Sequence, residues 1–430
     1  MFALGVVLLA LGLLASIAWH ELGHYTTARL FGVRVPEFMV GFGPTLFSRK
    51  VGETEFGFKA VPFGGYIRMI GMIPPQPGER LGRSRRSGPF QGLIDDVRAQ
   101  SNEDFCEGDD QRQFWTRSPW KRIVIMLAGP FMNLVLAGVL FAIVLMGIGI
   151  NDYSTRVRDV SLCAVPSSVA VQQGDGACPP GAPPSSPAAL AGLRAGDRII
   201  SLGGVPYDRW TDLARAIRAT SGPTPLVVER DGRQVDLVVD PIRMLLPRLD
   251  GARGTEEGSF VGFGPAIEYQ RLDLSQTAGR VGDLVRRTGV AIANLPSRVP
   301  ELFGAVFLGE QRALDSPVSV VGVSRMGGEL FAQEAPPSQE IAVMMQLLAG
   351  VNLSLCVLNL LPILPLDGGH VLPAIWESAR RRWWRWRGGP EPGAVDLARL
   401  MPVAYAFALV IMSYGALVVV ADIINPIRLT

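Results

Sequence analysis

Four long apolar runs constrain this chain more than any other feature of its sequence. Residues 2–18 hold no charged side chain, and a helical pattern continues from there to residue 30. The other three runs are residues 123–150, 342–361 and 401–424. About 20 apolar residues in a helix cross the ~30 Å hydrocarbon core of a bilayer. We therefore predict a polytopic α-helical membrane protein with four transmembrane helices.

A cleaved signal peptide is the alternative for the first run. Such a peptide begins with basic residues and ends at a cleavage site of small residues. No Lys or Arg precedes Arg29, so we favour a transmembrane helix.

The distribution of Lys and Arg predicts how the four helices are oriented. Short loops that are rich in Lys and Arg stay in the cytosol. The loops after the first and third helices are rich in arginine, whereas the tail after the fourth holds only Arg428. We therefore expect both termini, and the long segment of residues 151–341, to be extracytoplasmic.

Composition excludes two other classes of protein. The 41 Lys and Arg residues nearly balance the 39 Asp and Glu residues, so no strong positive field attracts nucleic acid. A chain with 48% hydrophobic and 19% charged residues is also not a disordered one. The expected partners are the lipid bilayer and other membrane proteins, with no nucleic acid.

The four cysteines are too few for a disulfide scaffold. Cys163 and Cys178 fall in the extracytoplasmic segment, where a disulfide persists. Cys106 falls in the first cytosolic loop, and Cys356 falls in the third apolar run. Two interpretations of the external pair stay open, a bridge and two free thiols.

The first apolar run ends in an HExxH motif, His20-Glu21-Leu22-Gly23-His24. Helix residues four apart share a face, so His20 and His24 can hold one Zn²⁺ beside Glu21 as the general base. Ionisable residues inside a membrane span are costly and mark functional sites. A histidine pair with a purely structural role is the alternative.

A catalytic zinc ion takes three protein ligands, and the third apolar run offers the missing one. It ends in NLLPILPLDGG at residues 359–369, where Pro362 and Pro365 cannot continue a helix. At 1.5 Å per residue this break and His20 both lie roughly 27 Å from the outer face. We therefore predict Asp367 as the third ligand, and an uncoordinated loop carboxylate is the alternative.

Three motifs, in this order, resemble the site-2 protease family of intramembrane zinc metalloproteases. They are HELGH at residues 20–24, AGPFMN at residues 128–133 and NLLPILPLDGG at residues 359–369. Within that family the chain is most similar to the bacterial RseP-like branch, the regulator-of-sigma-E proteases, here with a single extracytoplasmic PDZ domain.

The resemblance implies a role for each matching polar residue. It implies one Zn²⁺ as cofactor and Glu21 as the catalytic base, with these metal ligands: His20, His24 and Asp367. It also places Asn133 and Asn359 near the substrate backbone. Hydrogen bonds between helices are the alternative for the two asparagines.

Residues 33–75 contain two short aromatic runs, 35–44 and 53–60, which are bounded by Gly and Pro and predict strands. The resemblance implies a β-hairpin that dips into the membrane beside the zinc. Its edge strand would capture an opened substrate segment by β-augmentation. A cytosolic cover sheet without substrate contact is the alternative.

The external segment resembles a bacterial PDZ domain of the α+β class. AGLRAGD at residues 191–197 precedes a strand, a helix is predicted at 210–219, and strands are predicted at 226–230 and 234–240. PDZ domains bind C-terminal peptides by strand addition. Peptide capture and a size filter over the active site are both open, and we favour the filter.

These interpretations divide the chain into nine consecutive segments. They are a first transmembrane helix with HExxH (1–32), a membrane-associated β-hairpin region (33–75), a flexible cytosolic insertion (76–117), a second transmembrane helix (118–150), a PDZ domain (151–245), an extracytoplasmic linker with an amphipathic helix (246–341), a third transmembrane helix with the LDG motif (342–372), a cytosolic loop rich in Arg and Trp (373–399) and a fourth transmembrane helix (400–430).

The expected function is regulated intramembrane proteolysis of single-span membrane proteins in the bacterial cytoplasmic (inner) membrane. The resemblance implies trimmed anti-sigma factors as substrates, whose cleavage releases a transcription factor. Alternatives are an inactive PDZ adaptor, a zinc transporter and a protease that clears residual signal peptides. The complete HExxH and LDG set disfavours the first, and the base Glu21 disfavours transport.

Overall fold

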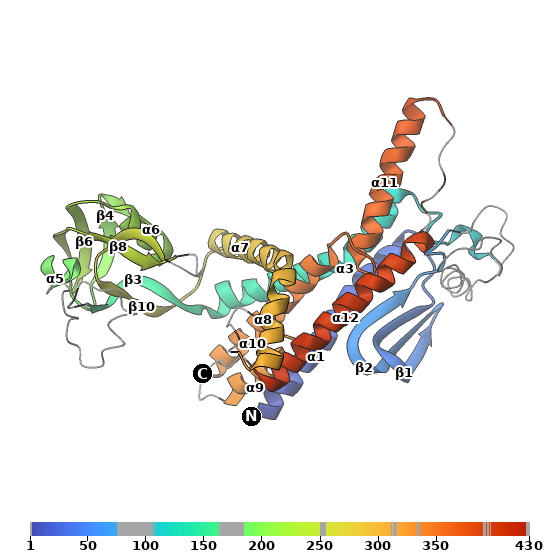
Figure 1. Cartoon of the computed structure of the whole chain (residues 1–430), viewed down its shortest axis with the longest axis horizontal. Helices are drawn as coiled ribbons and strands as arrows, with labels where there is room; N and C mark the ends of the chain where they lie inside the picture. The colour runs from blue at the N-terminus through green and yellow to red at the C-terminus, as the bar shows by residue number, and fades with distance from the viewer. Residues whose placement is uncertain are drawn as a thin grey trace. The chain divides into compact units, whose positions relative to one another are not determined.

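The computed structural model describes residues 2–74, 106, 108–161, 163, 185–249, 255–310, 312, 316–332, 336–389, 393, 395 and 397–426. Most of the predicted cytosolic insertion and Cys178 lie outside these ranges. The chain forms two compact units (Figure 1). Unit 1 comprises Met1–Ile148 and Leu272–Thr430, and unit 2 comprises Gly149–Arg271.

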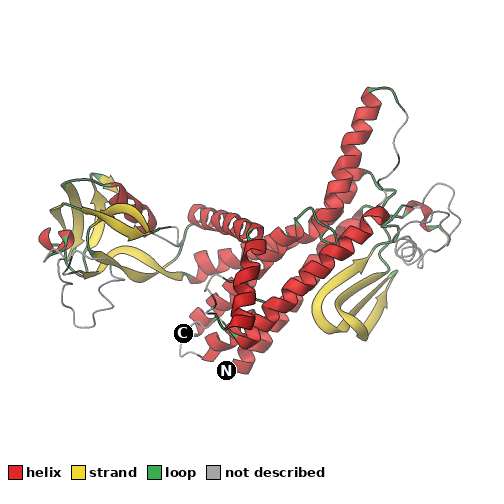
Figure 2. Ribbon diagram, in the orientation of Figure 1, coloured by secondary structure: helices red, strands yellow, loops and turns green. Residues whose placement is uncertain are grey.

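Among the described residues, four helices of unit 1 are long and apolar enough to cross a membrane (Figure 2). They are α1 (Phe2–Leu30), α3 (Pro119–Ala142), α10 (Pro337–Asn359) and α12 (Met401–Ile424). A π-helical segment continues α3 to Ile148. Length and composition therefore confirm the four predicted spans.

Helix α3 is central to unit 1, because it contacts α1, α10 and α11 (Asp367–Trp386). Helix α9 (Val320–Ala332) packs along α1, where Leu9 and Leu13 are buried. This helix lies within residues 246–341, the predicted extracytoplasmic linker with an amphipathic helix. At 13 residues, α9 is too short for a hydropathy window to detect.

The segment between unit 2 and α9 is helical, as its amphipathic pattern predicts. It contains α7 (Leu274–Ala293), η4 (Leu295–Arg298), α8 (Val299–Phe303) and η5 (Gly304–Leu308). A capping box starts α7, since the Asp273 side chain accepts from the N–H of Gln276, whose side chain accepts from the N–H of Asp273. Among its described residues, unit 1 also has two short 3₁₀ turns, η1 (Asp109–Gln111) and η6 (Leu397–Leu400).

The predicted hairpin is present as β1 (Glu37–Val51) and β2 (Thr54–Arg68), both longer than the sequence predicts. Each strand bends, so that Phe38 pairs with Phe56 on one side and with Ile67 on the other. The two strands thus form a small sheet in which residues 65–68 pair on one side only, within the described residues.

Helical geometry breaks between Asn359, where α10 ends, and Asp367, where α11 begins. This is the break that the two prolines predict. Gly368 packs onto it so closely that a Cβ would lie 2.4 Å from the carbonyl oxygen of Leu361. Only glycine fits there, and Asp367 starts α11 beside this contact.

A buried ionic cluster joins α11 to α3. Glu377 of α11 has no exposed surface, and its Oε2 lies 2.7 Å from Nη2 of Arg122 in α3. Its Oε1 lies 2.7 Å from Nη2 of Arg381, one turn further along α11. A buried carboxylate that loses its partner is strongly destabilising, so this cluster fixes the position of α11 on α3.

Unit 2 is built on an antiparallel sheet with the strand order β10-β3-β4-β6-β7, in which β5 pairs with β4, and it also has a β8–β9 hairpin. Its core contains Val157, Ile199, Leu213 and Val228. The elements are β3 (Ile150–Val160), α5 (Pro187–Leu190), β4 (Arg198–Leu202), β5 (Val205–Pro206), α6 (Trp210–Ala219), β6 (Thr224–Arg230), β7 (Arg233–Val239), β8 (Ile242–Pro247), β9 (Thr255–Phe260) and β10 (Phe263–Gln270).

The structure moves one predicted boundary. The sequence analysis ends this domain at residue 245, whereas unit 2 continues to Arg271. The reason is that β10 pairs with β3, with Gln270 opposite Ile150. This pairing joins positions far apart in the sequence, so no local pattern reveals it.

The cysteines differ in state. Cys163 in unit 2 is disulfide-bonded, whereas the thiols of Cys106 and Cys356 form no disulfide. The bonded state of Cys163 agrees with the bridged interpretation, and its predicted partner Cys178 lies outside the described residues.

Candidate metal centre

His20 and His24 lie on the same face of α1, one turn apart. Their Nε2 atoms are 3.2 Å apart, and the two rings meet edge to face at 77°. Both residues are buried, with 9% and 4% of their surface exposed. The helical spacing of HExxH therefore produces the predicted convergence of two imidazoles.

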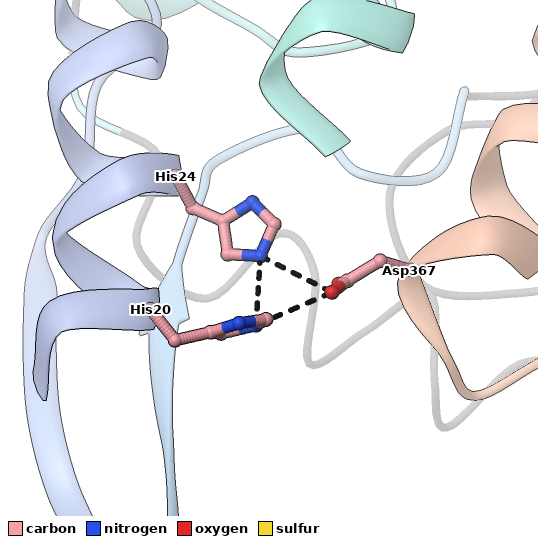
Figure 3. A group of neighbouring side chains, drawn as sticks. All are labelled: His20, His24 and Asp367. Atoms are coloured by element: carbon pink, nitrogen blue, oxygen red, sulfur yellow. Dashed lines mark hydrogen bonds and ion pairs between the residues drawn. The ribbon is translucent and has the colours of Figure 1, made fainter. Parts of the chain in front are cut away.

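Asp367 meets the two histidines from the start of α11 (Figure 3). Its Oδ2 lies 3.3 Å from Nε2 of His20 and 3.4 Å from Nε2 of His24. One nitrogen or oxygen atom from each of the three residues lies within 4.8 Å of the others. Two segments from opposite ends of the chain thus supply one compact donor set.

The chemistry of these donors fits a cation. The Nδ1 of His24 lies 2.8 Å from the carbonyl oxygen of Ile125. A carbonyl only accepts, so Nδ1 carries the proton and Nε2 of the neutral ring presents a lone pair. The Asp367 Oδ2 that faces it is buried without a hydrogen-bond partner. Two nitrogens and one carboxylate oxygen are a ligand set that suits Zn²⁺.

Glycines in α1 and α3 allow these two helices to pack closely together at the two histidines. A Cβ on Gly23 of α1 would lie 2.5 Å from the carbonyl oxygen of Ala128 in α3. A Cβ on Gly129 would lie 2.2 Å from Nε2 of His24 and 2.8 Å from Cε1 of His20. The sequence analysis quotes Gly129 only as part of a motif, because its role depends on a contact between helices.

Glu21 is buried beside the donor set and interacts electrostatically with all three of its members. Strand β2 passes next to it, since a Cβ on Gly65 would lie 3.2 Å from Cγ of Glu21 and 2.8 Å from a side-chain carbon of Ile17. The outer edge of the small sheet, at residues 65–68, therefore runs past the predicted base, and the backbone of Ile67 hydrogen-bonds to Glu21.

An ionic contact made by Glu53, which lies outside the membrane-spanning segments, holds the hairpin turn near the end of α1. Glu53 lies between Arg112 and Arg29, at 2.7 Å and 2.6 Å from their nearest nitrogens. The hydrogen bond from Arg112 has the largest effect and that from Arg29 the next largest, and together they lower the pKa of Glu53 to about 2. The turn therefore keeps its negative charge at all physiological pH values.

The two predicted asparagines occupy different surroundings. Asn133 of α3 has no exposed surface, and its Nδ2 lies 3.1 Å from Nδ1 of His20. Asn359 is half-buried at the last residue of α10. The sequence analysis missed a third one, Asn352, which is fully buried and donates to the hydroxyl of Ser16 at 2.8 Å.

The chain belongs to peptidase family M50, whose profile matches residues 8–388. This confirms the resemblance to the site-2 protease family. Together with the four apolar helices, it makes the chain a multi-pass membrane peptidase.

Individual relatives align along nearly the whole chain. The zinc metalloprotease Rip1 of Mycobacterium tuberculosis is 34% identical over 441 residues, which cover 100% of this chain and 99% of the relative. Its namesake from Mycolicibacterium smegmatis is 33% identical over 445 residues, with the same coverage. The metalloprotease MmpA of Caulobacter vibrioides is 29% identical over 394 residues, which cover 89% of this chain and 88% of the relative.

Proposed function

We propose that this protein is an intramembrane zinc endopeptidase whose one Zn²⁺ is held by His20, His24 and Asp367. The observation that carries the proposal is the convergence of these three donors beside Glu21, at the end of an apolar helix. The names of the aligned relatives, which are zinc metalloproteases, support it.

The chemistry divides between the metal and the protein. Zn²⁺ bound there supplies a Lewis acid that polarises the scissile carbonyl and lowers the pKa of water. The Glu21 carboxylate takes the proton of the attacking water and donates it to the leaving amide nitrogen. His24, held through Nδ1 by the carbonyl of Ile125, keeps its ring in place throughout.

Strand β2 is the proposed site of substrate presentation. A transmembrane helix hides its carbonyls in its own hydrogen bonds, so it must unwind before hydrolysis. Among the described residues, residues 65–68 pair on one side only, and a Cβ on Gly65 would lie 3.2 Å from Cγ of Glu21. An unwound segment that adds to this edge brings its peptide bonds to the base. The exposed side chains of Leu46 and Phe47 in β1 support insertion of this part of the hairpin into the bilayer.

Asn359 is the proposed contact to the substrate backbone. It is the last residue of α10, directly before the break that leads to Asp367. A half-buried amide at this position has one side free to donate to a peptide carbonyl.

The proposed substrates are single-span membrane proteins, with trimmed anti-sigma factors as the first choice and residual signal peptides as the second. The family resemblance supports the first. The arginine distribution supports extracytoplasmic termini, and the bacterial relatives support a bacterial cytoplasmic (inner) membrane location. An inactive adaptor is disfavoured because the base and all three ligands are present.

Unit 2 is the proposed PDZ domain, and one observation favours peptide binding by it. A cavity of about 250 Å³ lies between α6 and residues 260–263. It adjoins the start of β10, an edge strand of the sheet within the described residues. Its lining includes Trp210, Ile217 and Arg218 of α6. An apolar groove with an arginine beside a free strand edge suits the carboxyl end of an extended peptide.

We retain the size filter as the primary role of unit 2, because both of its ends join unit 1 directly. A domain tethered in this way restricts bulky ectodomains whether or not its groove is filled.

Cleavage of a membrane-embedded model substrate by the purified protein tests the proposed function. We expect cleavage that a zinc chelator stops and added Zn²⁺ restores. Cleavage that is insensitive to chelation, or no cleavage of any substrate by a zinc-loaded protein, would contradict it.

A further inference from the structure

Asn133 is a buried amide with one satisfied end and one unsatisfied end. Its Nδ2 lies 3.1 Å from Nδ1 of His20, and its Oδ1 is buried without a hydrogen-bond partner. The residue has no exposed surface. This arrangement therefore leaves a buried acceptor unused directly beside a proposed metal ligand.

If His20 binds the metal through Nε2, its Nδ1 needs a hydrogen-bond acceptor at the position of the Asn133 amide. Its Nε2 faces Asp367 and His24, so metal binding through Nε2 requires a lone pair on that atom. A neutral imidazole then carries its proton on Nδ1, which needs a hydrogen-bond acceptor. His24 meets the same need, because its Nδ1 faces the carbonyl of Ile125.

Half a turn of the Asn133 amide supplies the acceptor. The oxygen and nitrogen of an amide occupy nearly equivalent volumes, so the turn exchanges them without moving the helix. Oδ1 then accepts a hydrogen bond from the N–H at Nδ1 of His20, and Nδ2 moves to the position that Oδ1 held. Both histidines would thus be held by a carbonyl from α3, one from the backbone and one from a side chain.

We propose that Asn133 is a positioning residue that fixes the tautomer of His20, so that the lone pair of Nε2 points at the metal. This rests on the proposed function, and it replaces the substrate contact that the family resemblance implies for this residue. Groups that hold the second nitrogen of a metal-binding histidine orient the ring and raise its basicity.

A second buried asparagine provides a matched control. Asn352 of α10 also has no exposed surface, and its Nδ2 donates to Ser16 and to the carbonyl of Leu348, both at 2.8 Å. It links helices and touches none of the three proposed ligands. A purely structural role for Asn133 therefore predicts the same behaviour at both positions.

The test compares Zn²⁺ dissociation constants, measured by chelator competition on the full-length purified protein. Asn133→Leu keeps the shape and removes the acceptor, and we expect zinc to bind about 10- to 100-fold more weakly. Asn352→Leu is expected to lower the melting temperature and leave the zinc constant unchanged. Equal zinc constants for Asn133→Leu and wild type would overturn the proposal.

Asn133→Asp keeps the proposal testable if the leucine variant does not fold. A carboxylate accepts from Nδ1 of His20 as the amide oxygen does, so zinc affinity should stay within a few-fold of wild type. If the amide instead donates to His20, the aspartate loses that bond and zinc binding weakens, which would contradict the proposal. Absence of zinc binding by the wild type would refute the proposed function itself, which separates the two failures.

Discussion

Gly129 of α3 lies so close to His24 that any side chain would displace the ring. A Cβ at this position would stand 2.2 Å from Nε2 of His24, far inside van der Waals contact. The width of the metal centre is therefore set by a residue that has no donor atom. The spacing of HExxH aligns two imidazoles, and the absence of a methyl group on the next helix leaves room for both.

The first prediction is that Gly129→Ala weakens zinc binding at least about tenfold, the lower range for residues that orient ligands. The added methyl group clashes with both imidazole rings and displaces them from their positions at the metal centre. Zinc content after dialysis and the rate of cleavage measure the effect. Gly138→Ala is the control, because it lies on the same helix with nothing within 4 Å. Equal losses in both variants would show a general effect on α3.

The second prediction concerns the base. Glu21→Gln should reduce cleavage at least about 100-fold, the lower part of the range for general acid–base catalysis. Zinc content should stay at the wild-type level, because glutamine leaves His20, His24 and Asp367 untouched. Full activity in this variant would exclude Glu21 from proton transfer.

The third prediction concerns the ligand from α11. Asp367→Ala should lower zinc occupancy and activity together, because a carboxylate oxygen 3.3 Å and 3.4 Å from the two Nε2 atoms is lost. Metal analysis of the purified variant gives the occupancy. Undiminished zinc would mean that Asp367 is no ligand, and His370, one turn along α11, would be the next candidate.

The fourth prediction distinguishes the two proposed roles of unit 2, a size filter for substrates and capture of a substrate peptide. Because Ile150 pairs with Gln270, residues 150–270 can be replaced by a short Gly-Ser linker without stretching the chain. Zinc content should not change. A filter predicts that the excised protein cleaves untrimmed substrates and still cleaves trimmed ones at the normal rate. Slower cleavage of trimmed substrates would support capture, and equal loss on both would reject the filter.

The fifth prediction is a pH dependence within unit 2. Buried Asp197 accepts from Nε and Nη2 of Arg230, both at 2.7 Å. Burial opposes its ionisation, but Arg230 and the backbone N–H of Arg194 together outweigh burial, and the pKa of Asp197 is lowered. The ion pair thus stabilises unit 2 above the unfolded pKa of ~3.9, and this contribution is lost as pH falls through the lower folded pKa.

Asp197→Asn should therefore destabilise unit 2 by about 1–3 kcal/mol near neutral pH. The difference from wild type should shrink below pH ~4. Hydrogen exchange of β4 and β6 in the full-length protein measures both effects, and Asp236→Asn, at an exposed position of β7, is the control. A pH-independent difference would contradict the role of the charge.

The sequence predicts the features that depend on local patterns. Hydropathy locates the four long helices, and Pro362 and Pro365 locate the break before Asp367. The spacing within HExxH predicts that His20 and His24 converge, because an α-helix has a fixed period. Hydropathy, the conformational limits of proline and helical periodicity are sufficient to predict these features.

Features that depend on pairing between distant segments are not predictable in this way. Strand β10 pairs with the distant strand β3, so unit 2 extends to Arg271, beyond the predicted domain end at residue 245. Helix α9 is too short to register as a span. The contact between Asn133 and His20 joins two helices, and the sequence shows only that both residues are polar in apolar surroundings.

The ionic cluster at Glu377 fixes the position of one metal-centre residue, Asp367, from a point outside the centre. Asp367 and Glu377 lie on one continuous helix, roughly 15 Å apart at 1.5 Å per residue. Helix α11 is bound to α3 through the ion pair of Glu377 with Arg122. Its first residue, Asp367, presents a carboxylate to His20 and His24. The alignment of the centre is thus set partly by an ion pair that never meets the metal or the substrate.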